Sequence, residues 1–125
     1  MEGEGQMIHR HAAKLIVVLS FSCSFFASSV YAAELLMFRE HGCSWCEKWD
    51  EEIGEIYPKT TEGKAAPLRQ LNIHDPIPEY VAKNGLVHFS PTFVLVDDGA
   101  EIGRITGYPG EDNFWWFLEE LVKKM

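Results

Sequence analysis

The stretch LLMFREHGCSWCEKWDEEIGEIYP, residues 35–58, decides the fold. It opens with an apolar run of strand length, Leu35–Arg39. Over residues 44–57 apolar side chains recur every three or four positions, which is the period of a helix, and a proline ends the pattern. The recurring residues are Trp45, Trp49, Ile53 and Ile56. The stretch therefore predicts a strand followed by a helix, with Cys43 and Cys46 at the start of the helix.

The rest of the chain continues as short strands and helices. We expect a surface loop at 59–67, a strand at Leu68–Ile73, a short helix at Glu79–Lys83, a hairpin of Thr92–Val96 with Ala100–Thr106, and a helix at Glu111–Lys124. The last helix should bury one side, formed by Phe114, Phe117, Leu118 and Leu121. The order β-α-β-α-β-β-α predicts an α/β domain in which a mixed four-stranded sheet carries helices on both faces.

The first 32 residues have the pattern of an export signal. The apolar run Leu15–Ala27 follows a basic segment, and small residues precede a cleavage site after Ala32. The alternative is an uncleaved anchor, but 13 residues at about 1.5 Å each do not span a hydrocarbon core about 30 Å thick. We expect a signal peptide at 1–32, initiated at Met1 or Met7, and one domain at 33–125 that is exported to the periplasm.

Composition limits the class of partner. The chain is 46% hydrophobic with eight Phe and four Trp, enough for a real core, and its 19 acidic and 11 basic residues give a net charge of −8. Such an acidic surface argues against nucleic acid and anionic lipid and favours neutral or basic proteins. We expect a monomer that binds no nucleic acid.

The two cysteines of the expected mature chain are better suited to redox chemistry than to stapling. Cys23 leaves with the signal segment, and a bridge between Cys43 and Cys46 closes a loop too short to stabilise the fold much. Residues at i and i+3 of a helix face one side, and the positive end of the helix favours a thiolate. Cys43, the outer cysteine, is expected to attack a partner disulfide and Cys46 to resolve the mixed disulfide, without metal or organic cofactor.

Two other uses of the pair stay open. Cys-x-x-Cys is half of a zinc or copper site, for which His41, His74 or His88 would have to supply further ligands in a metal-delivery module. The pair is alternatively a local structural clip.

Several of these segments together resemble the thioredoxin superfamily: the strand 35–39, the Cys43–Cys46 motif, Ser90-Pro91-Thr92 before the hairpin, and Gly107 after it. The resemblance implies a thioredoxin-like fold and a cis Ser90–Pro91 bond beside the dithiol. It also implies a groove, lined by Trp45, Ser90, Pro91 and Gly107, in which a substrate peptide pairs like an extra strand.

The sequence departs from cytosolic thioredoxins in its proton handling. Met37 stands where their buried aspartate lies, and Gln70 stands where they have its partner lysine. Glu47 and His41, which flank the cysteines, are the candidates for proton transfer through water, against the alternative that both are plain solvated side chains.

More narrowly, residues 35–73 resemble the SoxS-type periplasmic thioredoxins of bacterial sulfur-oxidation systems. That resemblance implies a reductase that takes electrons from a membrane thiol transporter and keeps the cysteine of a sulfur-carrier protein active. A disulfide-forming oxidant or an isomerase is the enzymatic alternative.

Overall fold

The computed structural model describes residues 32–125. The predicted signal segment therefore lies outside the described residues apart from Ala32, and it stays a prediction. None of the helices within the described range has the length and apolar character needed to cross a bilayer.

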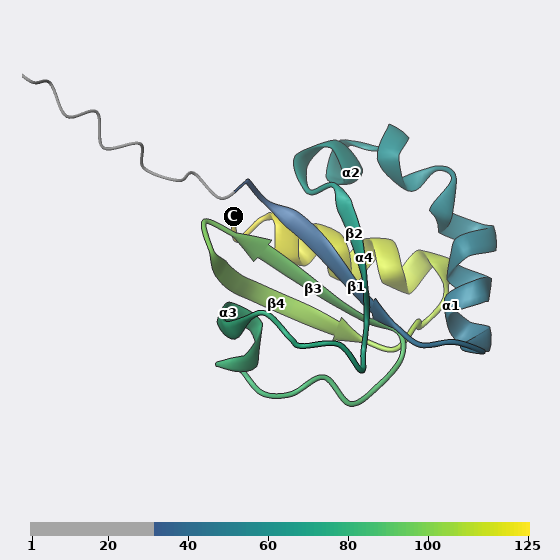
Figure 1. Cartoon of the computed structure of the whole chain (residues 1–125). Coiled ribbons are helices and arrows are strands. Elements are labelled where there is room, and N and C mark those ends of the chain that lie inside the picture. Colours follow the sequence, from purple (N-terminus) through teal and green to yellow (C-terminus); the bar gives the residue numbers. More distant parts are fainter. Residues whose placement is uncertain (1–31) are drawn as a thin grey trace, which may run out of the picture.

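A four-stranded mixed sheet organises the chain (Figure 1). The elements are β1 (Glu34–Arg39), α1 (Ser44–Trp49), the π-helical turn η1 (Asp50–Gly54), the 3-10 turn η2 (Tyr57–Lys59), α2 (Thr61–Ala65), β2 (Leu68–Asn72), α3 (Glu79–Ala82), β3 (Thr92–Asp97), β4 (Ala100–Thr106) and α4 (Glu111–Val122). The strand order is β2-β1-β3-β4, with β1 parallel to β2 and antiparallel to β3, which in turn is antiparallel to β4. This confirms the predicted thioredoxin-like fold class.

Helices cover both faces of the sheet, because alternate side chains of the central strands point to opposite sides. Leu35 and Met37 of β1 belong to the larger core, with Trp49 and the buried side of α4. Leu36 and Phe38 belong to a smaller core on the other face, which is closed by α3 and the loop after it. The Cys43–Cys46 motif and α3 are thereby held on opposite sides of one sheet.

The hairpin forms as expected, and its turn shows why. Strand β3 extends one residue beyond the prediction, to Asp97, which pairs with Ala100. The two residues between them, Asp98 and Gly99, both have positive φ, 48° and 71°. This is the turn that matches the twist of the flanking strands, and an Asp-Gly pair adopts it readily.

The helix predicted over residues 44–57 forms as far as Gly54, but it is not a regular α-helix throughout and it ends before residue 57. It widens into η1 after Trp49, and only a 3-10 turn follows. A π turn takes extra residues per turn and shifts the phase of the side chains that follow. Trp49 and Ile53 are buried as predicted, whereas Ile56 is 41% exposed and Trp45, in the first turn, is 55% exposed.

The surface loop predicted at 59–67 is also wrong, since α2 lies within it. The Thr60 hydroxyl caps this helix by accepting the Gly63 N–H at 3.0 Å, and the Tyr57 hydroxyl donates to the Ala66 carbonyl at 2.7 Å. A Cβ on Gly63 would lie 1.8 Å from the Tyr57 carbonyl oxygen. Gly63, whose residue type is typical of turns, is needed here for close packing inside a short helix.

Helix α4 buries Phe114, Leu118 and Leu121 as predicted, but not Phe117, which is 41% exposed. An aromatic cluster fills the larger core, in which the Trp49 ring lies 5.4 Å from the ring of Phe93 and 5.8 Å from that of Phe114. The cluster anchors α1 and α4 on the same face of the sheet.

Candidate active site

The two cysteines form a disulfide at the N-terminus of α1. Their Cα atoms lie 5.2 Å apart, and Cys43 is the N-cap of the helix, its Sγ accepting the Cys46 N–H at 3.1 Å. Cys43 is half-buried, whereas Cys46 has no exposed surface. A partner can therefore reach the Cys43 sulfur, and the Cys46 sulfur is held behind it.

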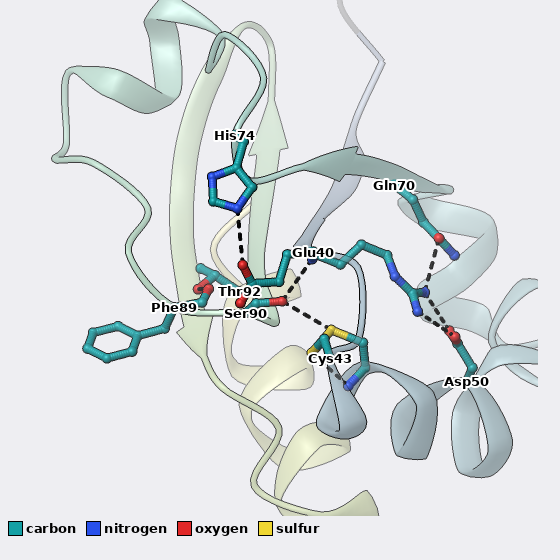
Figure 2. The surroundings of a disulfide bond; sticks show 10 residues. Glu40, Cys43, Asp50, Gln70, His74, Phe89, Ser90 and Thr92 are labelled. Carbon is teal, nitrogen blue, oxygen red and sulfur yellow. Dashed lines mark hydrogen bonds and ion pairs between the residues drawn. A yellow bond between two sulfur atoms is a disulfide. The ribbon is translucent and has the colours of Figure 1, made fainter.

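The Ser90 hydroxyl connects the inner sulfur to the end of β1. Its Oγ accepts the backbone N–H of Glu40 at 3.0 Å and lies 3.2 Å from Cys46 Sγ (Figure 2). In the disulfide the Cys46 sulfur carries no proton, so the serine hydroxyl is the group that can donate in this contact. The family resemblance placed Ser90 in the groove, but nothing in the sequence places its hydroxyl beside Cys46.

The Ser90–Pro91 peptide bond is cis, as the family resemblance implied. Hydrogen bonds hold the segment on both sides: the Thr92 hydroxyl donates to the Phe89 carbonyl at 2.6 Å, and the Gly107 N–H donates to the Pro91 carbonyl at 2.8 Å. The proline is thus locked against the turn that follows β4.

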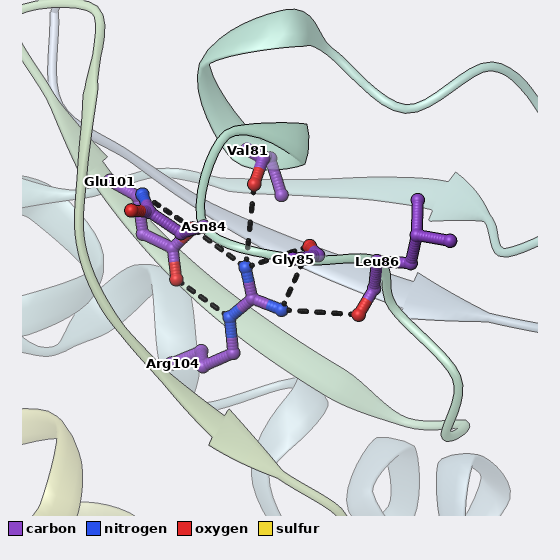
Figure 3. A network of polar contacts seen from close by, with 6 residues as sticks. All are labelled: Val81, Asn84, Gly85, Leu86, Glu101 and Arg104. Atoms are coloured by element: carbon purple, nitrogen blue, oxygen red, sulfur yellow. Dashed lines mark hydrogen bonds and ion pairs between the residues drawn. The ribbon is translucent and has the colours of Figure 1, made fainter.

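An ion pair on β4 holds the loop that precedes Ser90. Arg104 of β4 donates to both carboxylate oxygens of Glu101, at 2.6 and 2.7 Å, and Glu101 is only 5% exposed at its side chain. The guanidinium also reaches the backbone carbonyls of Val81, Gly85 and Leu86 at 3.4 to 3.5 Å (Figure 3). The loop that leads from α3 to Ser90 is tied to β4 in this way.

The four residues expected in the substrate groove lie together. Trp45, Ser90, Pro91 and Gly107 line one hollow of about 250 Å³, along with Thr106, Tyr108 and Pro109. The Trp45 indole is open to solvent, with the Lys48 ammonium 5.6 Å from its ring centroid. Neither cysteine lines this hollow, but the Oγ of Ser90, which does line it, lies 3.2 Å from Cys46 Sγ. We call this hollow the dithiol groove.

The candidates for proton transfer lie on the other side of Cys43. His41 and Glu47 line an open polar hollow of about 530 Å³ beside the outer sulfur, and both side chains are exposed. Within residues 32–125 neither side chain hydrogen-bonds to a sulfur or to any other protein group. The hollow that they share includes Cys43 but not Cys46, the resolving cysteine.

The departure from cytosolic thioredoxins has a structural counterpart at β1 and β2. Met37 is fully buried and pairs in register with Gln70. Gln70 accepts a hydrogen bond from Arg39 at 3.1 Å, and Arg39 makes a two-point ion pair with Asp50 at 3.0 and 2.9 Å. The thioether of Met37 therefore occupies the interior position, and the charged groups of Arg39 and Asp50 lie nearer the surface.

Tyr108 is a groove residue that the sequence reasoning missed. It is 6% exposed, and its hydroxyl donates to the Glu52 carboxylate of η1. Burial, and then the hydrogen bond to Glu52, raise the pKa of Tyr108 well above the ordinary 10.0. The contact fixes the turn after β4 against the helical segment, and a Tyr-Pro pair directly after Gly107 was the signal available in the sequence.

Among residues 32–125 there is no group of three or more His, Cys, Asp and Glu side chains placed to hold a metal ion. Of the histidines considered as ligands, His74 contacts the Glu40 carboxylate at 3.1 Å.

No protein-family model and no curated protein matches the chain. Among solved structures, it is similar to the periplasmic thioredoxin SoxS from Paracoccus pantotrophus in its reduced form, with 47% identity, a TM-score of 0.68, and coverage of 74% of this chain and 97% of that one. Fasciola hepatica thioredoxin is 23% identical with a TM-score of 0.53, over 70% of this chain and 79% of that one. Mitochondrial thioredoxin 3 from Saccharomyces cerevisiae is 20% identical with a TM-score of 0.54, over 71% and 78%. The last two similarities concern the fold alone.

Proposed function

The chain belongs to the SoxS-like branch of the thioredoxin superfamily and is a thiol-disulfide oxidoreductase, so we propose that it works as a periplasmic reductase of a protein disulfide. The observation that carries this proposal is the unequal exposure of the two cysteines at the start of α1: Cys43 is half-buried and borders an open hollow, whereas Cys46 has no exposed surface.

The reaction transfers two electrons to the partner. The Cys43 thiolate attacks one sulfur of the partner disulfide, forms a mixed disulfide and releases the other sulfur as a thiolate. Cys46 then attacks the Cys43 sulfur, which breaks the mixed disulfide and releases the second partner thiol. The protein is left with the Cys43–Cys46 disulfide, and a dithiol donor must reduce it with two electrons and two protons before the next cycle.

The similarity to a periplasmic SoxS and the export-type sequence at the N-terminus support the compartment, and the partners are proposed from the family resemblance. A membrane thiol transporter would supply the electrons, and the cysteine of a sulfur-carrier protein would receive them. The net charge of −8 favours neutral or basic surfaces on both proteins. In this role Trp45, Ser90, Pro91 and Gly107 hold the partner segment, and His41 and Glu47 exchange protons with water beside Cys43.

Insulin reduction and partner trapping test the proposal. We expect Cys43→Ser to abolish reduction of insulin disulfides and Cys46→Ser to accumulate mixed disulfides with a sulfur-carrier protein in a periplasmic extract. Ser44→Ala is the matched control, because Ser44 lies in the same motif, is exposed, and within residues 32–125 is not among the groups that hydrogen-bond to either sulfur.

Two further measurements separate the alternatives. A midpoint potential above about −150 mV, near the strongly oxidising members of the superfamily, would overturn the reductase role in favour of disulfide formation. The metal-delivery module would be favoured by two results together. Purified wild-type protein would contain stoichiometric zinc or copper that Cys43→Ser loses, and the wild type would not reduce insulin.

A further inference from the structure

A second, smaller hollow continues the dithiol groove away from the sulfurs. It has a volume of about 160 Å³ and is lined by Arg104, Ile105, Thr106, Pro109 and Phe117. Thr106 and Pro109 also line the dithiol groove, so the two hollows share a wall. A chain segment that leaves the groove past Pro109 enters this second hollow, which we call the Phe117 hollow.

The Phe117 hollow is apolar although an arginine borders it. The Arg104 guanidinium is already engaged by Glu101 and by loop carbonyls, so its charge is not free for an acidic ligand (Figure 3). Of the lining residues, Ile105 is buried at 6% exposure and Phe117 reaches the surface at 41% exposure. The Trp116 ring meets the Phe117 ring edge-on, with centroids 4.9 Å apart, which limits the orientations open to Phe117.

The size suits one aliphatic side chain. A volume of about 160 Å³ holds roughly five waters at about 30 Å³ each, which is ample for the four carbons of a leucine side chain. The hollow lies beside β4, the last strand of the sheet, whose outer edge pairs with no other strand of residues 32–125. An extended segment therefore has open access along this edge.

We propose that the Phe117 hollow is a specificity subsite that receives a bulky aliphatic side chain of the partner protein, a few residues from the cysteine that reacts with Cys43. The proposal rests on the proposed function, because it assumes that the partner segment lies extended in the dithiol groove. It adds a chemical requirement that the groove alone does not impose: an apolar residue at a fixed distance from the reacting cysteine.

The experiment uses symmetrical disulfides of short Gly- and Ser-rich peptides. Each peptide has one central cysteine, and a leucine is placed at each other position in turn. The reduced protein is mixed with each disulfide, and the single-turnover rate constant is measured from the appearance of peptide thiol. We expect one or two leucine positions to raise the rate constant about tenfold over the peptide without leucine, the scale of selectivity that an apolar pocket provides.

Variants decide whether Phe117 is responsible. Phe117→Ala should remove most of the leucine gain, Phe117→Leu should keep part of it, and Ile56→Ala should leave it unchanged, because Ile56 is also 41% exposed and borders neither hollow. All three should reduce hydroxyethyl disulfide at the wild-type rate, since this small substrate does not reach the subsite; that rate also verifies folding.

A rate constant independent of leucine position, or a gain that survives Phe117→Ala, would overturn the subsite. If Phe117→Ala lowered the rate with hydroxyethyl disulfide as much as the rate with the leucine peptide, Phe117 would act through the stability of the fold and not as a subsite. If the wild-type protein reduces neither hydroxyethyl disulfide nor insulin, the proposed function itself has failed, which is a different result.

Discussion

Replacing Ser90 by alanine tests how the buried sulfur is made reactive. The change removes the hydroxyl that lies 3.2 Å from Cys46 Sγ and that accepts the Glu40 N–H. Glu40 is exposed, so water replaces the lost acceptor there. The same hydroxyl is placed to donate to the Cys46 thiolate once the disulfide is reduced. Because Cys46 has no exposed surface, water does not restore that hydrogen bond in Ser90→Ala.

The magnitude follows from two opposing effects. A hydrogen bond to a charged group contributes about 1.5–3 kcal/mol, so losing it lowers the population of the Cys46 thiolate roughly 10- to 150-fold. The remaining thiolate is more basic and more nucleophilic, which offsets a little under half of the loss on a logarithmic scale, given a Brønsted slope of about 0.4–0.5. The resolving step should therefore slow by about 4- to 15-fold in Ser90→Ala.

The assay follows the mixed disulfide directly. Reduced protein is mixed with hydroxyethyl disulfide, the reaction is stopped with acid, and the adduct on Cys43 is quantified by mass spectrometry over time. Attack by Cys43 should proceed at the wild-type rate, so that only the lifetime of the adduct grows. Ser90→Thr keeps the hydroxyl and is the matched control. An unchanged adduct lifetime in Ser90→Ala, or an equal slowing in Ser90→Thr, would refute the reasoning.

Three further predictions concern stability. Gly63→Ala places a Cβ 1.8 Å from the Tyr57 carbonyl oxygen. We expect this substitution to lower the free energy of unfolding, measured in urea, by about 3 kcal/mol. A variant as stable as the wild type would contradict the close packing of Gly63 against Tyr57. Arg104→Met leaves the nearly buried Glu101 carboxylate without its ion pair and should cost about 3 kcal/mol, most of which the double variant with Glu101→Gln recovers if the unpaired charge is the cause. Because burial and then a hydrogen bond raise the pKa of Tyr108 above the ordinary 10.0, the stability it contributes is fully present below that pH. It should be lost as the pH rises toward the folded pKa, since the unfolded chain then releases a proton that the native state keeps. The part of the tyrosinate absorbance that is missing in Tyr108→Phe should appear together with the loss of circular dichroism, and its appearance in the folded protein near pH 10 would count against this.

The local sequence pattern is enough to predict an element when the residues of that element determine its conformation by themselves. The hairpin was predictable because Asp98 and Gly99 adopt positive φ for reasons internal to those residues. Helix α2 was not predictable, because its glycine is selected by contact with Tyr57, six residues earlier, and not by a local preference. The predicted burial of Phe117 was wrong for a related reason. Helical periodicity marks an apolar side of α4, but the neighbouring strands decide how much of that side is covered.

The sequence by itself determined the redox chemistry of this protein. The spacing of Cys43 and Cys46 at a helix start specifies which sulfurs can join, since residues at i and i+3 share a side of the helix. Only the tertiary structure decided what surrounds those sulfurs. Ser90 reaches Cys46 from 44 positions away, and Phe117 and Pro109 meet beside β4, because the packing of the sheet and not the local chain brings distant segments together.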